Sequence, residues 1–289
     1  MTSLVINAKS LRDKKVEELK SRVNSLSKIA NRLPKLVIIN ASDCLASQSY
    51  IRNKNKLGEE VGIEVEVLQY DNSITTEELY EKIQSLNNDV NTSGIILQLP
   101  LYEHLDKDKL IASISPKKDA DCFSNERLGK MLQGDTKILP CTPKGVISLL
   151  ENHLVEIGSS NVCILGRSVH VGLSLSILLT KLGANVTCVH SKTKKDDLDR
   201  ILKSSDIIIS CIGKYDFIKS EQLKENSVLI GVGIDFFEGK QRTDYDVDAI
   251  REAGVCKYVG DRVNTTGTAT VLSLIENTVA LFEEQVQGD

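Results

Sequence analysis

Residues 161–172 read Asn-Val-Cys-Ile-Leu-Gly-Arg-Ser-Val-His-Val-Gly, and this stretch decides the fold. An apolar strand over Val162–Leu165 runs into a turn bounded by glycines, and an apolar helix over Leu173–Leu182 follows. A second strand over Val186–His190 completes a βαβ unit. Glycines let the backbone approach a phosphate, and the helix N-terminus offers free N–H groups and the positive end of the helix dipole. The stretch therefore predicts a nucleotide site.

The turn is not a strict G-x-G-x-x-G motif, because Ser168 stands at the middle glycine position. Glycine spacing alone is a weak signal, and an ordinary βαβ turn followed by a solvated lysine is the alternative. The end of the second strand strengthens the prediction: it reads His190-Ser191-Lys192-Thr193, without an acid. An acid there would bind the free ribose hydroxyl of NAD, whereas cationic and hydroxyl groups suit a 2′-phosphate. The sequence therefore favours NADP over NAD.

Length and composition favour a globular protein of two domains that binds neither nucleic acid nor membranes. The chain has 289 residues, of which 41% are hydrophobic and 26% charged, and its formal net charge is −4. This charge gives no general attraction to nucleic acid or to an anionic membrane. No apolar run is long enough to span a bilayer, and the N-terminus lacks an apolar signal core. A cytoplasmic location is expected.

Cysteines and histidines show no metal-ligand spacing. The seven cysteines are scattered and form no C-x-x-C pair, which argues against a disulfide framework and against a zinc site. The four histidines are equally scattered. We therefore expect no metal.

Alternating strand and helix patterns predict an α/β fold with parallel sheets and helices on both faces. Helices are expected over Ala8–Arg32, Ala46–Val61, Thr75–Leu86, His104–Ile111, Pro143–His153 and Thr270–Gln285. Further strands are expected over Leu36–Asn40, Glu64–Leu68, Gly94–Gln98, Ile207–Ser210, Ser227–Val232 and Lys257–Val259. Pro116–Gly134 is expected to be a charged loop, and a loop of this length is either functional or a misread element.

Four polar side chains outside the nucleotide unit are candidates for chemistry. Tyr50 and Lys54 are four residues apart on one helix and share a face, where a ring can hold a substrate while the lysine moves a proton. Gln98 ends a strand, which is where open α/β sheets place ligands. Asp121 lies in the charged loop. Taken singly, these residues are also typical of a surface helix, a strand-end cap and a solvated charge cluster.

Taken together and in their order, the motifs resemble those of the bifunctional 5,10-methylenetetrahydrofolate dehydrogenase/cyclohydrolase (FolD-type) family. The matching blocks are Ser47–Lys54, Val61–Ile63, Gly94–Leu101, Pro116–Asp121, Pro140–Gly145, Gly166–Gly172, His190–Thr193, Gly260–Asp261 and Asn277–Val279. The resemblance implies an N-terminal α/β folate-binding domain of residues 1–139 with 269–289. It also implies a Rossmann-like NADP-binding domain of residues 140–268 with a parallel sheet.

The resemblance implies two reactions. Methylenetetrahydrofolate is oxidised by NADP⁺ to the methenyl form, and water then converts the methenyl form to 10-formyltetrahydrofolate. A homodimer and a role in purine biosynthesis are implied in the same way.

The resemblance also implies roles for the candidate residues. Lys54 would be the catalytic lysine with Gln98 as its neighbour, Tyr50 would stack on the folate, and Asp121 would anchor the pterin. Leu99 and Pro100 would complete the substrate site. Arg167 and Ser191 would hold the 2′-phosphate. The remaining residues expected at the cofactor are Gly166, Ser168, Val171, Gly172, His190, Thr193, Cys211, Gly213, Val232 and Ile234.

The sequence departs from the family pattern near its C-terminus. The family loop reads roughly Thr-Pro-Val-Pro-Gly-Gly-Val-Gly-Pro-Met-Thr, whereas here Gly260-Asp261 leads almost at once into Arg262–Thr270. We expect a shortened loop, a looser pocket, and weaker folate binding or an altered balance of the two activities. Other departures from residues common in the family are Cys122, Ser124, Arg127 and Ser174.

Three alternatives stay open. A short-chain dehydrogenase also carries a Tyr-x-x-x-Lys pair, but its nucleotide turn precedes the pair, whereas here it follows. A family member with one of the two activities is the second alternative. A folate- or nucleotide-binding protein without turnover is the third, and replacing Lys54 separates it from an enzyme.

Overall fold

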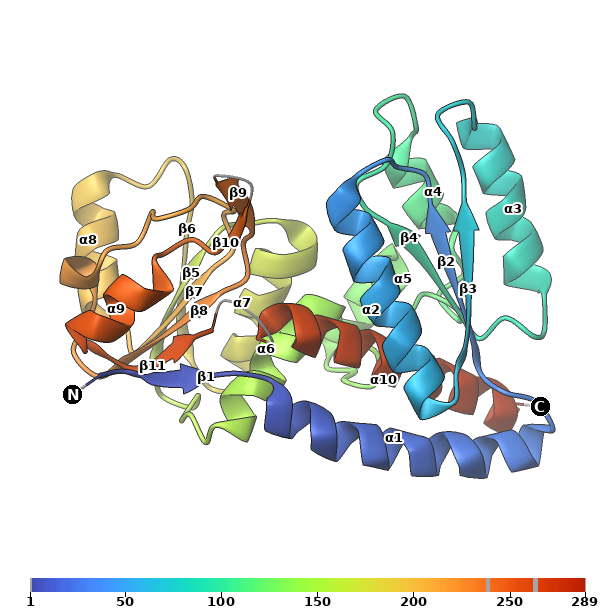
Figure 1. The fold of residues 1–289 in the computed structure, drawn as a ribbon, viewed down its shortest axis with the longest axis horizontal. Coiled ribbons are helices and arrows are strands. Elements are labelled where there is room, and N and C mark those ends of the chain that lie inside the picture. Colours follow the sequence, from blue (N-terminus) through green and yellow to red (C-terminus); the bar gives the residue numbers. More distant parts are fainter. Residues whose placement is uncertain (1, 238–239, 262–264, 289) are drawn as a thin grey trace. The chain divides into compact units, whose positions relative to one another are not determined.

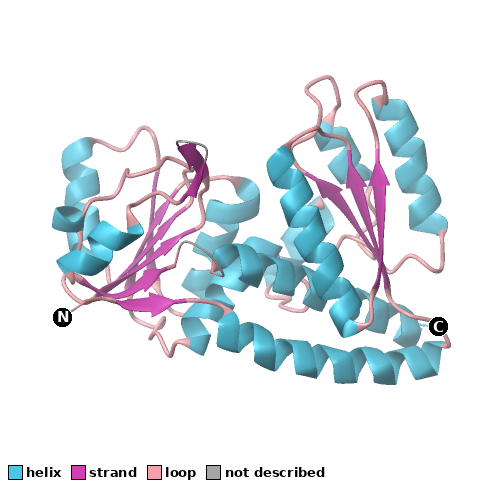
Figure 2. Ribbon diagram, viewed as in Figure 1, coloured by secondary structure: helices cyan, strands magenta, loops and turns pink. Residues whose placement is uncertain are grey.

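The computed structural model describes residues 2–237, 240–261 and 265–288. The chain folds into two compact α/β units, each with its own parallel sheet (Figure 1). Helices cover both faces of each sheet (Figure 2). The predicted α/β class with two domains is confirmed. We call the units the lysine unit, after Lys54, and the nucleotide unit, after the predicted nucleotide turn.

Each unit is assembled from two stretches that are far apart in the sequence. The lysine unit consists of Asp13–Cys141 and Val271–Asp289, and the nucleotide unit of Met1–Arg12 and Thr142–Thr270. The first residues differ from the prediction, which places them in the folate-binding domain. They belong to the nucleotide unit because β1 (Leu4–Ile6) pairs in parallel with β11 (Cys256–Gly260) of its sheet. A strand of three residues carries too little pattern to be recognised in the sequence.

The lysine unit is built on a three-stranded parallel sheet with the order β3-β2-β4. Its strands are β2 (Lys35–Asn40), β3 (Glu64–Gln69) and β4 (Gly94–Gln98). β2 is central, and its residues from Leu36 to Asn40 are fully buried. Because the strands are parallel, their carboxyl ends lie at one edge of the sheet. Residues that end the three strands therefore meet at that edge.

Different helices cover the two faces of this sheet. α3 (Thr76–Asn88) and α4 (Lys107–Ser113) bury an apolar cluster against one face. α2 (Leu45–Val61) covers the other face, where a Cβ on its Gly58 would lie 2.4 Å from the side chain of Val65. Glycine at this position therefore lets α2 approach the sheet closely.

The segment predicted as a long loop contains a helix, so that prediction is wrong. α5 spans Asn125–Gln133, and the hydroxyl of Ser124 caps it by accepting from the N–H of Arg127. Gly134 ends the helix in the left-handed conformation at φ 106°. Its nine residues include three charged and three apolar side chains, and its buried positions are Arg127 and Met131. A buried arginine reads as exposed in a sequence, so the inner side of the helix is not recognised.

The nucleotide unit is built on a six-stranded parallel sheet with the order β1-β11-β8-β7-β5-β6. Its remaining strands are β5 (Asn161–Leu165), β6 (Asn185–Val189), β7 (Ile207–Ser210) and β8 (Ser227–Gly231). The chain runs from β5 to β6 on one side and then returns to β7 on the other side of β5. The strand order reverses at this point, which is where open α/β sheets bind ligands.

The helices of the nucleotide unit include two that the sequence did not indicate. α6 (Cys141–Asn152) and α7 (Ser174–Lys181) agree with predicted helices, whereas α8 (Lys195–Ser204) and α9 (Val247–Ala253) were missed. Both missed helices are short and rich in charge. Three further elements are a hairpin of β9 (Asp235–Phe237) and β10 (Lys240–Arg242), and a 3₁₀ turn at Ser220–Gln222.

Two long helices contribute residues to both units. They are α1 (Lys9–Ala30) and α10 (Thr266–Gly288), and both agree with predicted helices. Within the described residues, no helix combines the length and apolar character needed to cross a membrane.

Candidate active site and nucleotide site

Lys54 lies on the face of α2 that packs against the sheet. The buried positions of this face are Ile51, Lys54, Leu57, Gly58 and Val61, which form one stripe of the helix. The apolar members of this stripe hold the helix in place, and the lysine is carried inward with them. Its side chain is 8% exposed as a result. The fold thus places an amine in the interior at the end of the sheet.

The end of β4 holds this amine. Lys54 Nζ donates a hydrogen bond of 2.8 Å to Oε1 of Gln98. Gln98 Nε2 donates in turn to the backbone oxygen of Leu99 at 2.9 Å, which fixes the orientation of the amide. Ser47 donates to the same oxygen at 3.5 Å, and the peptide between Leu99 and Pro100 is cis. The structure therefore brings together four of the residues predicted for the substrate site.

Burial shifts the acid–base equilibrium of Lys54 toward the neutral amine. It lowers the pKa of Lys54, and the negative charge of Asp121 and the Cys141 thiol act against it. Because burial is the largest effect, the neutral amine is favoured. Tyr50 lies one turn earlier on α2, and burial raises the pKa of its phenol. A neutral amine whose position is fixed by a hydrogen bond is suited to accept a proton.

Asp121 is positioned by buried neighbours in its own loop. The carboxylate of Asp119 accepts from the N–H of Ser124 at 2.7 Å, and burial raises the pKa of Asp119. Asn277 Nδ2 donates to the backbone oxygens of Ala120 at 2.9 Å and Leu139 at 2.8 Å. The peptide directly before Asp121 is therefore tied to α10.

The predicted nucleotide residues lie at the carboxyl ends of four adjacent strands, β6, β5, β7 and β8. The turn after β5 begins at Gly166, whose φ of 116° favours glycine and whose N–H donates to Val189 O at 2.9 Å. A Cβ on Gly172 would lie 2.1 Å from Gly166 O, so both ends of the turn require glycine. The turn therefore leaves no room for side chains at its base, as a phosphate cradle requires.

The helix after this turn begins differently from the prediction. Val169–Leu173 form a π-helical turn, in which the N–H of Leu173 donates to Ser168 O at 3.0 Å. The α-helix starts one residue later than predicted, at Ser174, whose hydroxyl donates to Val169 O at 2.6 Å. Single π turns often occur at functional sites.

The turn after β6 carries no acid. Thr193 Oγ1 accepts from the N–H of His190 at 3.0 Å, and the N–H of Thr193 donates to His190 O at 2.8 Å. These bonds close a tight turn with Ser191 and Lys192 on the exposed side. Arg167 is exposed as well. This hydroxyl- and cation-bearing turn fits the phosphate of NADP better than the free hydroxyl of NAD.

Two family models match the chain. The model described as the tetrahydrofolate dehydrogenase/cyclohydrolase catalytic domain matches residues 6–121. The model described as the NAD(P)-binding domain of the same proteins matches residues 140–286. The chain belongs to the tetrahydrofolate dehydrogenase/cyclohydrolase family. The resemblance inferred from the sequence motifs is thereby confirmed.

Relatives in this family match over nearly their whole length. "Bifunctional protein FolD" of Clostridium botulinum is 36% identical over 280 residues, which cover 97% of this chain and 98% of the relative. A crystal structure of the bifunctional FolD of Campylobacter jejuni has a TM-score of 0.92 at 33% identity, covering 98% of this chain and 99% of the other. The Trypanosoma brucei enzyme, solved with NADP and an inhibitor, has a TM-score of 0.93 at 30% identity and covers 99% of both chains.

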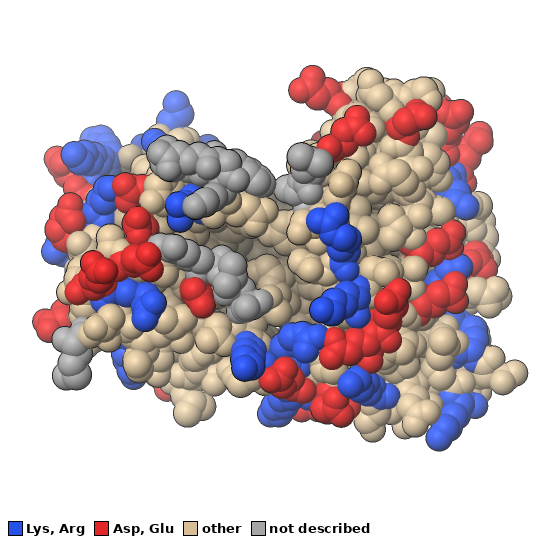
Figure 3. All heavy atoms as spheres, viewed as in Figure 1, with Lys and Arg blue, Asp and Glu red and all other residues tan. Residues whose placement is uncertain are grey.

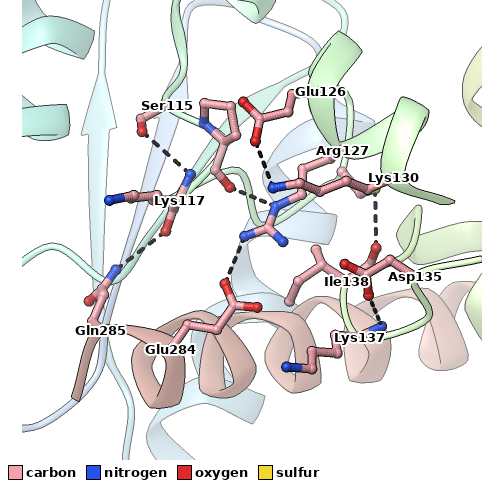
Figure 4. A network of polar contacts seen from close by, with 12 residues as sticks. Ser115, Lys117, Glu126, Arg127, Lys130, Asp135, Lys137, Ile138, Glu284 and Gln285 are labelled. Atoms are coloured by element: carbon pink, nitrogen blue, oxygen red, sulfur yellow. Dashed lines mark hydrogen bonds and ion pairs between the residues drawn. The ribbon is translucent and has the colours of Figure 1, made fainter. Parts of the chain in front are cut away.

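Residues unusual for the family have clear structural settings. Cys122 has a φ of 59°, the left-handed region that favours glycine, and its buried thiol donates to Ile138 O at 3.4 Å. Arg127 is 4% exposed, donates from Nε to Pro116 O at 2.7 Å, and pairs with Glu284 at 2.9 Å (Figure 4). The loop that carries Asp121 is therefore fastened to α10 a second time.

The nucleotide unit of this protein contains a buried carboxylate, Asp244, that the sequence did not single out. Asp244 is fully buried and accepts from the hydroxyl of Ser210 at 2.6 Å and from the N–H groups of Ile212 at 3.2 Å and Lys214 at 2.6 Å. These bonds shape the turn that holds Cys211 and Gly213. Asp244 lies in a polar stretch that reads as solvated charge, so no pattern separates it from its neighbours.

The last residues predicted to bind the cofactor lie where the backbone turns after β7 and β8 approach each other closely. A Cβ on Gly233 would lie 2.3 Å from the N of Gly213 and 2.5 Å from Oδ2 of Asp244. Val232 and Ile234 flank this glycine, and Val232 N–H donates to Ser210 O at 2.7 Å. The turns after β7 and β8 are therefore packed directly on each other.

The predicted shortened C-terminal loop falls on residues 262–264, which lie outside the described residues. Before them, the N–H of Asp261 donates to Ile6 O at 3.0 Å. All seven cysteines are free. The described residues contain no cluster of three His, Cys, Asp or Glu side chains suited to a metal.

Proposed function

We propose that this protein oxidises 5,10-methylenetetrahydrofolate with NADP⁺ and hydrolyses the resulting methenyl form to 10-formyltetrahydrofolate. The observation that carries this proposal is the buried amine of Lys54, bonded at 2.8 Å to Gln98 in the catalytic domain of this family. Its relatives are named bifunctional proteins, and this chain matches them over nearly its full length.

In the hydrolytic reaction Lys54 acts first as a base. The neutral amine takes a proton from a water molecule as the water oxygen bonds to the methenyl carbon. The resulting ammonium then gives a proton to the ring nitrogen as the bond between that nitrogen and the carbon breaks, and the hydroxyl on the carbon releases its proton to water to leave the formyl group. Gln98 holds the amine in position for both transfers through its side-chain oxygen.

Other side chains of the lysine unit hold the folate. The Asp121 carboxylate accepts hydrogen bonds from the pterin, and Tyr50 offers an aromatic ring for stacking. Leu99 and Pro100 supply the apolar wall beside Gln98. Asp121 also opposes the effect of burial on Lys54, because its negative charge raises the pKa of the amine.

The nucleotide unit binds NADP⁺, which supplies the hydride acceptor when bound. The backbone between Gly166 and Gly172 approaches the pyrophosphate, with Ser168 and Val171 in the same turn. Arg167 and Ser191 hold the 2′-phosphate, while His190 and Thr193 shape the turn beneath it. Cys211, Gly213, Val232 and Ile234 line the turns after β7 and β8.

We further propose that the enzyme is a cytoplasmic homodimer and that its product serves purine biosynthesis. Seven free cysteines suit a reducing compartment. Acidic and basic side chains are interspersed over the face seen in Figure 3, which suits a small-molecule enzyme better than a nucleic-acid binder. Sedimentation velocity tests the dimer directly.

A spectrophotometric assay tests the activity. Purified protein is given methylenetetrahydrofolate with NADP⁺ or NAD⁺, and hydrolysis of methenyltetrahydrofolate is followed separately. Lys54→Met is expected to lower hydrolysis by about 10²-fold or more. Lys56→Met, an exposed lysine on the same helix, is the matched control. Equal hydrolysis by both variants contradicts the proposed role of Lys54, and folded wild-type protein without either activity favours a binding protein.

A further inference from the structure

Three amide side chains form a row across the carboxyl edge of the sheet in the lysine unit. Asn40 of β2 is paired in register with Gln69 of β3 on one side and with Gln98 of β4 on the other. Side chains of residues paired in register point to the same face of a sheet. Gln98 reaches Lys54 of α2, so the amide of Asn40 also faces this helix.

The side-chain nitrogen of Asn40 has hydrogen-bond partners, whereas its side-chain oxygen has none among the described residues. Its Nδ2 donates to Gln69 Oε1 at 2.7 Å and lies 3.4 Å from Ser42 O. The backbone oxygen of Ser42 can only accept, so it fixes which end of the amide carries the nitrogen. Asn40 is fully buried, and among the described residues no donor lies within hydrogen-bond distance of its Oδ1. An acceptor buried without a donor has lost its hydrogen bonds to water and destabilises the fold unless a donor reaches it.

Protonated Lys54, in contrast, has more hydrogen-bond donors than acceptors nearby. An ammonium group has three N–H donors, and Gln98 Oε1 is the acceptor that the structure gives to this amine. Adjacent strands lie about 4.8 Å apart, so the row places Asn40 one strand beyond the present acceptor. The lysine stem has four rotatable bonds and can swing across that interval.

We propose that Asn40 is a positioning residue whose Oδ1 accepts a second hydrogen bond from Lys54 when the amine is protonated. The amine then has two places: it is bonded to Gln98 while neutral, and it is shared between Gln98 and Asn40 after it has taken a proton. This inference deepens the proposed function, because it explains how a buried site tolerates the ammonium that hydrolysis creates.

Other groups also act on this amine. Electrostatic interactions with Asp121 and with Cys141 raise the pKa of Lys54, and Tyr50 lies one turn before it on α2. An acceptor at Asn40 acts in the same direction as these interactions, because it favours the protonated form. Removing that acceptor therefore lowers the pKa of Lys54.

The test measures the titration of Lys54 directly and then through activity. Full-length protein carrying ¹³Cε-labelled lysine is titrated by NMR, and Lys54→Arg assigns the signal. Asn40→Leu is expected to move the midpoint about one pH unit lower. The acid limb of the hydrolysis rate moves the same way, since the neutral amine then persists to lower pH. Asn40→Ala is the second variant, in case leucine disturbs the packing.

Asn55→Leu is the matched control, since this amide of α2 donates to Glu59 at 2.8 Å and its loss leaves the row of Gln69, Asn40 and Gln98 intact. Its titration midpoint should equal that of the wild type. A rise in KM for the folate with an unchanged midpoint would mean that Oδ1 meets the substrate, and it overturns the proposal. If Asn40→Leu lowers Tm and leaves the titration midpoint unchanged, Asn40 has a structural role, and the proposal is wrong. If Asn40→Leu lowers the titration midpoint of Lys54 in a protein that does not hydrolyse methenyltetrahydrofolate, the role of Asn40 stands and the proposed function is wrong.

Discussion

Oε1 of Gln98 lies 2.8 Å from Nζ of Lys54, and no rearrangement of the backbone is needed to bring them together. Gln98 ends β4, and Lys54 stands on the inward stripe of α2, which Gly58 allows to pack closely on the sheet. The geometry of the site therefore follows from the packing of one helix on one sheet.

Replacing Gln98 by glutamate should shift the pH dependence of hydrolysis. A carboxylate beside the amine favours the ammonium and raises the pKa of Lys54. If the neutral amine is the base, the acid limb of the rate profile moves to higher pH, and activity near pH 7 falls about tenfold or more. The pH profile of kcat measures this. Recovery of the rate at high pH is the expected sign, whereas a uniform loss at every pH contradicts the base role.

Replacing Asp244 by asparagine should weaken NADP binding and lower stability. The carboxylate accepts three hydrogen bonds, and the NH₂ of an amide would face either the N–H of Ile212 at Oδ2 or the N–H of Lys214 at Oδ1. A cost of about 1–3 kcal/mol is expected. Urea unfolding and calorimetric titration with NADP⁺ measure the two effects. Asp248→Asn, on the exposed side of α9, is the control and should change neither.

Replacing Gly172 by alanine should abolish nucleotide binding. The added Cβ would lie 2.1 Å from Gly166 O, so the backbone of the turn must shift. Gly129 lies in α5 with nothing within 4 Å of an added Cβ, and alanine there should stabilise the protein by about 0.5–1 kcal/mol. Fluorescence titration with NADPH and thermal unfolding compare the pair. Unchanged affinity in Gly172→Ala counts against the phosphate cradle.

The preference for NADP should depend on Arg167 and Ser191. Arg167→Gln removes a cation and Ser191→Asp adds a carboxylate that favours a ribose hydroxyl. The ratio of kcat/KM for NADP⁺ to that for NAD⁺ should fall about ten- to a hundredfold. Lys181→Gln, an exposed lysine at the far end of α7, is the control. An equal ratio in all three variants would mean that other residues select the cofactor.

The sequence singles out the candidate residues of the site but not the residues that support them. Lys54, Gln98 and the glycines of the nucleotide turn occur at spacings or strand ends that carry meaning in a sequence. Asp244 and Asn40 act through burial and through neighbours distant in the chain. Burial of a polar residue becomes visible only when the sheets are assembled, because a polar residue in a sequence reads as exposed.

The helices also differ in how well the sequence predicts them. Long periodic helices such as α1 and α10 were predicted within a few residues, since many apolar positions repeat at the helical period. α5 was missed because a single buried arginine, Arg127, stands where an apolar residue would mark the inner side. The tertiary contact with Glu284 compensates for that charge, and this contact has no trace in the local pattern.

The division of the chain has a consequence for synthesis on the ribosome. The lysine unit needs Val271–Asp289, which include the fully buried Phe282 and Asn277, the residue that anchors the loop of Asp121. These residues are synthesised after every residue of the nucleotide unit. The lysine unit is interrupted by most of the nucleotide unit and is completed after it, so a nascent chain stalled before α10 has every strand of its nucleotide sheet and an unfinished lysine site.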